Sequence, residues 1–261
     1  MKVVMSIAGS DCSGGAGVQA DLKTFEAFGV FGTSVITVLT AQNTMGVSDI
    51  YEVSPEFVKA QIKAIVEDFD VAAIKIGMLY SKAIIVAVRE AIAPLKIPIV
   101  FDPVFISKAG SPLLQSDAVE EMKTLLAYVS VVTPNAYEAK ELFGYVFGDT
   151  LSLEQIQNQK CPILVKHHVL ELASGALSVD QLFFAHEKRI FQTPLVQTTN
   201  THGTGCSFSS AIAAGLANGN SLEEAILRAK NFINAALLNA PNIGHGRGPI
   251  HHKRGGEEVS K

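Results

Sequence analysis

Residues Asn200–Ser207 read NTHGTGCS and directly precede an apolar run that begins at Phe208. The apolar residues of that run recur at three- and four-residue spacing, which predicts a helix from about Gly205 to Ala217. A helix that begins at this turn points its unpaired backbone N–H groups and the positive end of its dipole toward the preceding loop. Because glycine lets an anion approach the backbone closely, we expect the turn to bind a phosphate or a developing negative charge.

Cys206 lies within this first turn, where the helix dipole is expected to favour the thiolate form of its side chain. A candidate base in the wall of an anion-binding turn is an arrangement suited to phosphoryl transfer. Taken alone, however, Gly-x-Gly before a helix is common, and an isolated cysteine is most often a small packing residue. These residues by themselves therefore favour a structural role over a catalytic one.

The composition describes a folded protein without an obvious polymer or membrane partner. The chain has 261 residues, of which 48% are apolar and 18% charged, enough for a well-buried core. The formal net charge of −4 provides no basic surface for nucleic acid. Three distant cysteines show neither zinc spacing nor a disulfide framework, which is typical of a reducing compartment. With no apolar segment long enough for a signal peptide or a membrane helix, we expect a soluble cytoplasmic protein.

Apolar strands alternate with amphipathic helices, a pattern that predicts a largely parallel sheet with helices on both faces. The expected strands are Val3–Ala8, Ser34–Leu39, Val71–Ile76, Ile97–Phe101, Val129–Thr133 and Pro162–Lys166, with a hairpin of Leu182–Phe184 and Arg189–Thr193. The expected helices are Val18–Phe28, Pro55–Phe69, Ser81–Ala93, Ser116–Tyr128, one that begins near Asn135, the helix after Gly203, and a last one that Ser221 and Glu224 cap. No internal repeat or linker is present, so we assign one domain.

That domain is expected to span residues 1–249 and to be followed by a polar tail of residues 250–261. The segment from Gly244 onward is rich in glycine and charge, so we expect much of it to be loose. His251 and His252 are interpreted as solvated residues of this tail rather than metal ligands.

Ligands of open α/β sheets bind beyond the carboxyl ends of the strands, and several candidate site residues stand there. The residues that follow predicted strands are Asp11, Gln42, Met78, Asp102 and Asn135. The loop of residues 9–17 contains four glycines, but it lacks the Gly-Lys-Ser/Thr ending of a P-loop and the Gly-x-Gly-x-x-Gly spacing of a dinucleotide site. On composition it is a flexible loop that could cover a ligand.

A set of segments in unbroken order carries a family resemblance. The segments are Gly9–Asp21, Ala41–Thr44, Lys75–Met78, Asp102–Val104, Thr133–Glu138 and Asn200–Cys206. Together they closely resemble the bacterial hydroxymethylpyrimidine and phosphomethylpyrimidine kinases of thiamine biosynthesis, from residue 3 to about residue 249. The resemblance implies a single-domain ribokinase-like α/β fold. It also implies two successive phosphorylations by ATP, first of 4-amino-5-hydroxymethyl-2-methylpyrimidine and then of its monophosphate.

The same resemblance implies a catalytic turn. Its residues Gly203, Thr204, Gly205 and Cys206 match the anion hole of the family. Cys206 stands where most ribokinase relatives have an aspartate base, and we expect it to help remove the hydroxyl proton. The second transfer goes to a phosphate that is mostly ionised at neutral pH, so this step needs no base.

Gln42 is the expected specificity residue for the pyrimidine. Its amide offers an acceptor and a pair of donors, complementary to the ring nitrogen and amino group of a 4-aminopyrimidine. The alternative is an amide that bonds only to its own loop. Near the same ring the resemblance implies Asp21, with Gly9, Met78 and Val104 as walls.

The nucleotide side of the expected site contains carboxylates and lysines. Asp102 and Glu138 are oxygen ligands suited to Mg²⁺, and Asn135 and Lys166 match positions near the phosphates of ATP. Lys230, on the last long helix, is expected near the nucleotide. Asp102 could instead cap a turn before Pro103, and Lys230 could lie on a solvated face. Relatives of this kind also suggest a homodimer.

This sequence departs from the family pattern after Lys166. Where the family usually has two glycines and a histidine, this chain has His167, His168 and Val169. We therefore expect the tight backbone turn over the nucleotide to be altered, with altered nucleotide affinity; the alternative is a plain surface strand end. Cys12 also replaces a proline that is common in the first loop, with no evident consequence.

Other functions are open to a chain of this kind. A pyridoxal or pyridoxine kinase of the same lineage is the nearest, but its substrate lacks the aminopyrimidine edge that Gln42 would read. A sugar kinase is disfavoured because Cys206 replaces the usual aspartate. A non-catalytic pyrimidine-binding regulator would have no use for the combination of Asp102, Glu138, Lys166 and Cys206.

Overall fold

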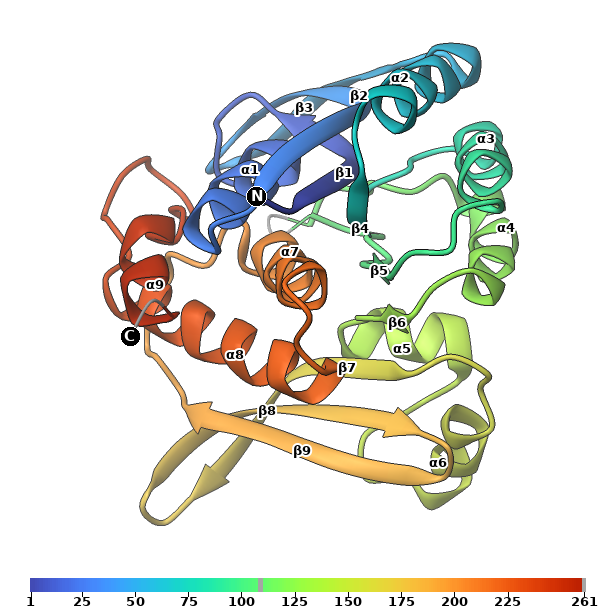
Figure 1. Cartoon of the computed structure of the whole chain (residues 1–261). Coiled ribbons are helices and arrows are strands. Elements are labelled where there is room, and N and C mark those ends of the chain that lie inside the picture. The colour runs from blue at the N-terminus through green and yellow to red at the C-terminus, as the bar shows by residue number, and fades with distance from the viewer. Residues whose placement is uncertain (108–109, 260–261) are drawn as a thin grey trace.

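Nine strands pair in the order β3-β2-β1-β4-β5-β6-β7-β8-β9 to form one sheet (Figure 1). A computed structural model of the chain describes residues 1–107 and 110–259. The strands are β1 (Val3–Asp11), β2 (Phe31–Asn43), β3 (Gly46–Glu52), β4 (Val71–Ile76), β5 (Ile99–Phe101), β6 (Val131–Val132), β7 (Ile163–Leu172), β8 (Gly175–Phe184) and β9 (Glu187–Pro194). The six strands that are adjacent in the order β2-β1-β4-β5-β6-β7 are parallel. At one edge β3 pairs antiparallel with β2, and at the other edge β8 pairs antiparallel with β7 and β9 with β8. The prediction of a mostly parallel sheet is confirmed.

Helices cover both faces of this sheet (Figure 1). One face carries α2 (Pro55–Asp68), α3 (Lys82–Ile92), α4 (Val119–Lys123), α5 (Ala136–Phe143) and α6 (Thr150–Gln157). The other face carries α1 (Gly17–Ala27), α7 (Thr204–Ala217), α8 (Leu222–Leu238) and α9 (His252–Val259). Short 3₁₀ turns, η1 (Ser116–Ala118) and η2 (Thr124–Ala127), flank α4. No helix within the described ranges has the length and apolar character needed to cross a lipid bilayer.

The central strands divide their side chains between two cores. In β4, Ile74 and Ile76 pack with α2 and α3, whereas Ala73 belongs to the core formed with α7 and α8, and Lys75, between the two isoleucines, pairs with Asp21 of α1. This alternation follows from the two-residue period of a strand. Because both faces are covered, every residue of the strand other than Lys75 is apolar, and the predicted bounds of the strand are confirmed.

Local capping chemistry fixes several helix starts. The Ser81 hydroxyl accepts the Ile84 N–H at the start of α3, and Ser221 forms a capping box with Glu224 at the start of α8. The region expected as a single helix over 116–128 is instead divided into η1, α4 and η2. Strand β3 and helix α6 were not predicted. Strand β2 extends through Asn43 because it pairs with β3 around a turn at Gly46.

The prediction for the C-terminal segment is wrong. Residues His252–Val259 form α9 instead of a loose tail, and residues 260–261 lie outside the described part. Gly255 and Gly256 are the reason: a Cβ on Gly255 would lie 2.7 Å from the Phe232 ring, and one on Gly256 would lie 2.9 Å from Cβ of Ala27. These glycines let α9 approach α8 and α1 closely.

His252, the first residue of α9, is buried and not solvated as expected. Its Nε2 lies 2.9 Å from Oγ of Ser207, in the first turns of α7. Burial lowers the pKa of His252 to about 4, and the positive charges of Lys23 and His251 act in the same direction. The C-terminal helix is therefore docked onto α7 through a neutral imidazole.

This burial predicts a pH-dependent stability. The unfolded chain protonates His252 near its ordinary pKa of about 6.5, but the folded chain does so only near 4. Between these values the unfolded state binds more protons, so stability falls as the pH falls, by up to about 1.4 kcal/mol per pH unit for this group. We expect His252→Gln to reduce this slope in urea titrations across that window. His245→Gln, at an exposed histidine outside α9, serves as the control and should keep the wild-type slope.

Candidate active site

The turn before α7 depends on glycine at position 203. Gly203 caps the helix with a φ of 81°, in the left-handed region that glycine adopts at low cost. A Cβ here would lie 1.8 Å from the carbonyl oxygen of Gly15 in the first loop. The next residue, Thr204, donates its hydroxyl to the Thr201 carbonyl at 2.6 Å. The two glycine-rich segments are therefore in direct contact.

Asp11, the last residue of β1, joins these segments. Its carboxylate accepts the N–H groups of Ser13, Gly15 and Ala16 at 2.9, 3.1 and 2.8 Å. One oxygen also lies 2.7 Å from Nε2 of His202, the residue before Gly203. Burial raises the pKa of Asp11, but the hydrogen bonds from His202 and Ser13 outweigh it and hold the pKa at about 2. The carboxylate is thus ionised at neutral pH.

Cys206 is partly exposed in the first turn of α7. Burial raises its pKa above the ordinary value, while the ammonium group of Lys75 and the Gly17 N–H act in the opposite direction without reversing it. Asp21 and Asp102 raise the pKa further. The expectation that the helix dipole makes Cys206 a thiolate is therefore wrong for the free protein: its thiol is neutral at pH 7.

A fully buried ion pair supports the helix that carries Cys206. Asp21 on α1 accepts the Lys75 ammonium at 2.8 Å with both oxygens. The hydroxyls of Ser6 and Ser210 bond the same carboxylate at 2.5 and 2.7 Å. With all of these partners and no exposed surface, Asp21 is not brought to the open part of the site. Sequence analysis selected Asp21 but did not identify Lys75 as its partner.

Asp102 and Lys166 meet beside the turn. Asp102 follows β5, and its carboxylate bonds the Lys166 ammonium from β7. Thr133 donates its hydroxyl to the same carboxylate at 3.3 Å. A Cβ on Gly205 would lie 3.5 Å from Nζ of Lys166 and 3.7 Å from Oδ2 of Asp102, so the first turn of α7 borders this ion pair. The structure thus brings together the anion-binding turn, the lysine and the aspartate that the sequence singled out.

Glu138 lies in the same group of charges. It forms a capping box with Asn135 at the start of α5, and its own carboxylate accepts the Asn135 N–H at 2.8 Å. Burial raises the pKa of Glu138 to about 7; Lys166 lowers it and Asp102 raises it. Two carboxylates therefore share one ammonium group.

Asp102 and Glu138 suit a magnesium ion in ligand type. Mg²⁺ is commonly bound by one or two carboxylates together with substrate phosphates. Within residues 1–107 and 110–259, no cluster of three or more histidine, cysteine, aspartate or glutamate side chains could hold a metal.

An unpartnered hydroxyl lies next to the turn. Within the described part of the chain, Oγ1 of Thr201 is the one buried side-chain nitrogen or oxygen without a hydrogen-bond partner. Such groups are rare in folded proteins because they lose their bond to water. A polar ligand group at the turn would satisfy it. Sequence analysis included Thr201 in its motif without assigning it a role.

Gln42 lies within β2 and not after the strand. Its Oε1 accepts the Thr40 hydroxyl at 3.0 Å, which is the expected alternative of an amide that bonds to its own segment. Its backbone is tied to Cys12, whose thiol donates to the Gln42 carbonyl at 3.1 Å and accepts the Gln42 N–H at 3.3 Å. Cys12, which had no evident consequence in the sequence, therefore holds the backbone of the expected specificity residue.

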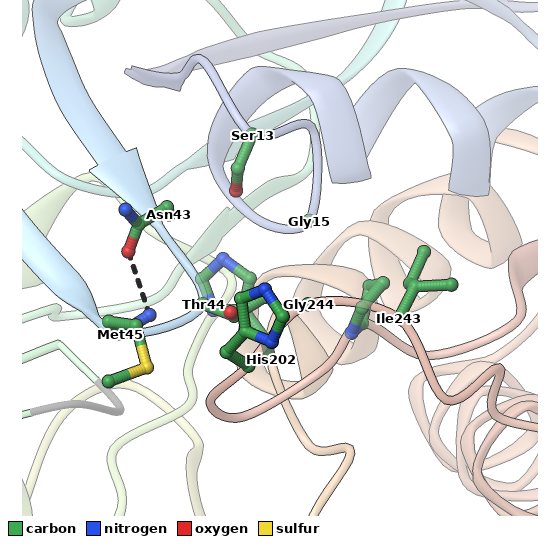
Figure 2. A pocket seen from close by; sticks show the side chains of 10 residues that line it. Ser13, Gly15, Asn43, Thr44, Met45, His202, Ile243 and Gly244 are labelled. Carbon is green, nitrogen blue, oxygen red and sulfur yellow. Dashed lines mark hydrogen bonds between the residues drawn. The ribbon is translucent and has the colours of Figure 1, made fainter.

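The expected walls of the pyrimidine site are partly assembled. A Cβ on Gly9 would lie 3.1 Å from the sulfur of Met78, so these residues are neighbours, and Val104 lies half-buried beside the core. A cavity of about 320 Å³ opens next to His202, between the first loop and Asn43–Met45 (Figure 2). Ile243 and Gly244 close its far side. This cavity borders the first loop and His202, and its lining includes none of Gly9, Gln42, Met78 and Val104, so it is adjacent to the expected pyrimidine walls and not enclosed by them.

Lys230 is buried rather than solvated. Its ammonium lies 2.7 Å from Oδ2 of Asp180 on β8, and Oδ1 of Asp180 accepts the His167 N–H at 2.7 Å. His167 has a φ of 61°, so it adopts the left-handed conformation that a glycine would have at this position. A left-handed residue therefore follows Lys166 without a glycine, at a cost of about 1–2 kcal/mol. The expected change in nucleotide affinity stays a prediction.

The fold and this convergence of charges define a small-molecule phosphotransferase with a ribokinase-like α/β fold. The family model described as phosphomethylpyrimidine kinase matches residues 11–251. The chain belongs to this family.

Relatives that match nearly the whole chain carry the name of the same kinase family. The hydroxymethylpyrimidine/phosphomethylpyrimidine kinase of Haemophilus influenzae is 44% identical and is matched over 97% of both chains. The kinase of the same name from Escherichia coli is 40% identical over 95% of this chain and 96% of its own.

Solved structures also share the fold. A pyridoxal kinase from Staphylococcus aureus in complex with AMP-PCP and pyridoxal has a TM-score of 0.84 and 29% identity, over 97% of this chain and 94% of its own. A phosphomethylpyrimidine kinase from Clostridium difficile has a TM-score of 0.77 and 36% identity, over 91% of this chain and all of its own.

The two glycines of the turn should respond differently to alanine. At Gly205 a methyl group is compatible with the helix but lies against Lys166 and Asp102, so Gly205→Ala should keep the wild-type Tm and lower kcat by at least about tenfold. At Gly203 the methyl group overlaps a backbone oxygen, so Gly203→Ala should lower the unfolding free energy by about 3 kcal/mol or more. Thermal unfolding and steady-state kinetics measure the two effects, and full activity of Gly205→Ala would contradict the assignment.

Proposed function

We propose that this chain uses ATP to phosphorylate 4-amino-5-hydroxymethyl-2-methylpyrimidine and then its monophosphate, giving the diphosphate for thiamine biosynthesis. The observation that carries the proposal is the N-terminus of α7, where Gly205 and Cys206 border the Lys166–Asp102 pair. Relatives named for this activity, at 40–44% identity over nearly the whole chain, support it. Pyridoxal kinases of the same fold in complexes with ADP and AMP-PCP support ATP as the donor.

Each group of residues has a distinct task in this reaction. The N–H groups of Gly203, Gly205 and Cys206 and the helix dipole stabilise negative charge on the transferring phosphoryl group, while the Thr204 N–H donates to the Thr201 carbonyl. Lys166, which is more exposed than its partner Asp102, binds the phosphates of the nucleotide. Asp102 and Glu138 would hold Mg²⁺, which neutralises phosphate charge when it is bound. Asn135 fixes Glu138 through their shared cap.

Cys206 acts on the proton of the substrate hydroxyl. Its raised pKa makes the thiolate scarce at neutral pH but makes each thiolate a stronger base. The first transfer should therefore accelerate as the pH rises, because more of the thiol is ionised. The second transfer, to a phosphate oxygen that is already ionised, should lack this dependence.

Substitution of Cys206 should separate the two transfers. We expect Cys206→Ala to slow the first transfer by about 10²-fold or more and to change the second far less. In the wild type, the ratio of the first-transfer to the second-transfer kcat/KM should rise between about pH 7 and 8, and the variant should lack this rise; titration of Glu138 affects both transfers and cancels in the ratio. Cys161→Ala, at a buried thiol outside the turn, is the control. Equal losses in both transfers would refute the role of a base.

Gln42 is proposed to read the aminopyrimidine edge. Gln42→Leu removes all amide contacts, and Gln42→Glu keeps the shape but replaces the donor pair with a charged acceptor. We expect each to lower kcat/KM for the hydroxymethylpyrimidine by about 10- to 100-fold, equivalent to 1–3 kcal/mol. Assays with ATP and Mg²⁺, with products resolved by mass, measure this. Unchanged kinetics would assign Gln42 to its bond with Thr40 alone.

Pyridoxal phosphorylation is proposed as a side activity. The observation that favours it is the TM-score of 0.85 with a pyridoxal kinase from Bacillus subtilis, at 30% identity. The same assay with pyridoxal tests it, and pyridoxal turnover should be less sensitive to Gln42 because pyridoxal lacks the aminopyrimidine edge. The proposed partners are the aminopyrimidine and ATP, without nucleic acid or membrane. We also propose that the chain acts as a homodimer in the cytoplasm.

A further inference from the structure

Two consecutive residues of β7, Lys166 and His167, are not paired with β8, and Lys166 is the residue that is proposed to bind the nucleotide. The pairing of β7 with β8 is interrupted between Val165 and His168, so Lys166 and His167 are bypassed. On the other side of β7, the Lys166 N–H donates to the Pro134 carbonyl at 2.9 Å in a parallel bridge between Asn135 and Lys166, so only the pairing with β8 is interrupted. The His167 N–H is bonded by a side chain, the Asp180 carboxylate, at 2.7 Å. Asp180 thus replaces a ladder bond that the bulge removes.

The Asp180 carboxylate is also bound by a lysine from α8. Its second oxygen lies 2.7 Å from the ammonium of Lys230 on α8. Asp180 and Lys230 are both buried, each 4% exposed. A buried charged pair of this kind needs both partners, because either charge alone would be left without solvation. The pair therefore fixes α8, β8 and the backbone of His167 relative to one another.

The bond from the His167 N–H to Asp180 matters because His167 is not a glycine. Its φ of 61° lies in the left-handed region, which a side chain with a Cβ disfavours. Without a partner for its N–H group, the backbone here would relax toward an ordinary strand conformation. Because His167 is bonded directly to Lys166, such a change would shift the backbone from which the Lys166 side chain reaches Asp102.

We propose that Asp180, supported by Lys230, is a positioning residue that aims the Lys166 ammonium at the phosphates of the nucleotide. It acts through the backbone of His167 and does not touch the substrate. The inference rests on the proposed function, in which Lys166 binds ATP. It gives Lys230 an indirect task in place of the nucleotide contact that the sequence suggested.

The test compares two double variants that both lack the charges of Asp180 and Lys230 and that differ in whether residue 180 can accept the His167 N–H. Asp180→Asn/Lys230→Met removes both charges but keeps an oxygen for the His167 N–H, whereas Asp180→Ala/Lys230→Met removes that oxygen as well. Calorimetric titration with AMP-PCP and Mg²⁺ should give a wild-type Kd within about threefold for the asparagine pair and a Kd about tenfold weaker for the alanine pair. In kinase assays, KM for ATP should rise in the alanine pair while KM for the pyrimidine changes little.

A second change separates positioning from general damage. Adding His167→Gly to the alanine pair should recover most of the lost affinity, because glycine adopts the left-handed conformation without the bond. Adding His167→Ala, which removes the same side chain but keeps a Cβ, should not. Equal recovery by both, or recovery by neither, would overturn the proposal. Should the alanine pair fail to fold, tenfold weaker binding by the asparagine pair would overturn it instead.

The outcomes also distinguish this inference from the proposed function. If the wild type binds AMP-PCP but phosphorylates no pyrimidine, the proposed substrate is wrong, and the binding series still decides the role of Asp180. If the wild type binds no nucleotide, both proposals fail.

Discussion

The carboxylate of Asp11 determines how the two glycine-rich segments of this chain meet. It bonds the backbone of the first loop and also bonds His202, which lies 191 residues further along the chain. Burial alone would favour the neutral acid, but hydrogen bonds from both segments hold the pKa at about 2. Bonds to a charged acceptor are roughly twice as strong as neutral ones, so the ionised form holds the junction together. The contact between Gly203 and the Gly15 carbonyl depends on this junction.

The turn that this junction creates is an anion site, yet it does not ionise its own cysteine. A helix dipole contributes about 0.3–1 kcal/mol near the N-terminus, which corresponds to less than one pKa unit. Burial of Cys206 and the nearby carboxylates outweigh that contribution and the ammonium of Lys75 together, so its pKa is raised. The local field is nevertheless well suited to a ligand that brings its own negative charge, because the helix N–H groups and Lys166 border the same space.

Features with a local cause were predictable from the sequence, and features with a distant cause were not. The run of β4 and the cap at Ser81 depend only on neighbouring residues, and both are observed. Strand β3 is an edge strand with a mixed pattern of exposure, so it lacks the apolar signal of a buried strand. Gly255 indicated a flexible tail, but its lack of a side chain serves close packing on α8. In the site, residue types indicated which side chains carry charge. The bonds of Lys230 and of the His167 N–H to Asp180 depend on how α8, β8 and β7 pack together, which no local pattern reveals.

Among the described residues, three lysines form buried or nearly buried ion pairs with aspartates, and the exposure of these lysines separates structural pairs from the pair at the proposed site. The pairs Lys75–Asp21 and Lys230–Asp180 have lysine side chains only 0% and 5% exposed, and hydroxyl or backbone donors satisfy the remaining carboxylate oxygens. Such pairs cannot exchange partners without exposing an unpaired buried charge. Lys166 is 13% exposed, pairs with Asp102 and interacts electrostatically with Glu138, whose pKa is raised to about 7. It can therefore turn from Asp102 to an incoming phosphate while both carboxylates become available to a cation, which is the exchange of charges that transfer from a metal-bound nucleotide requires.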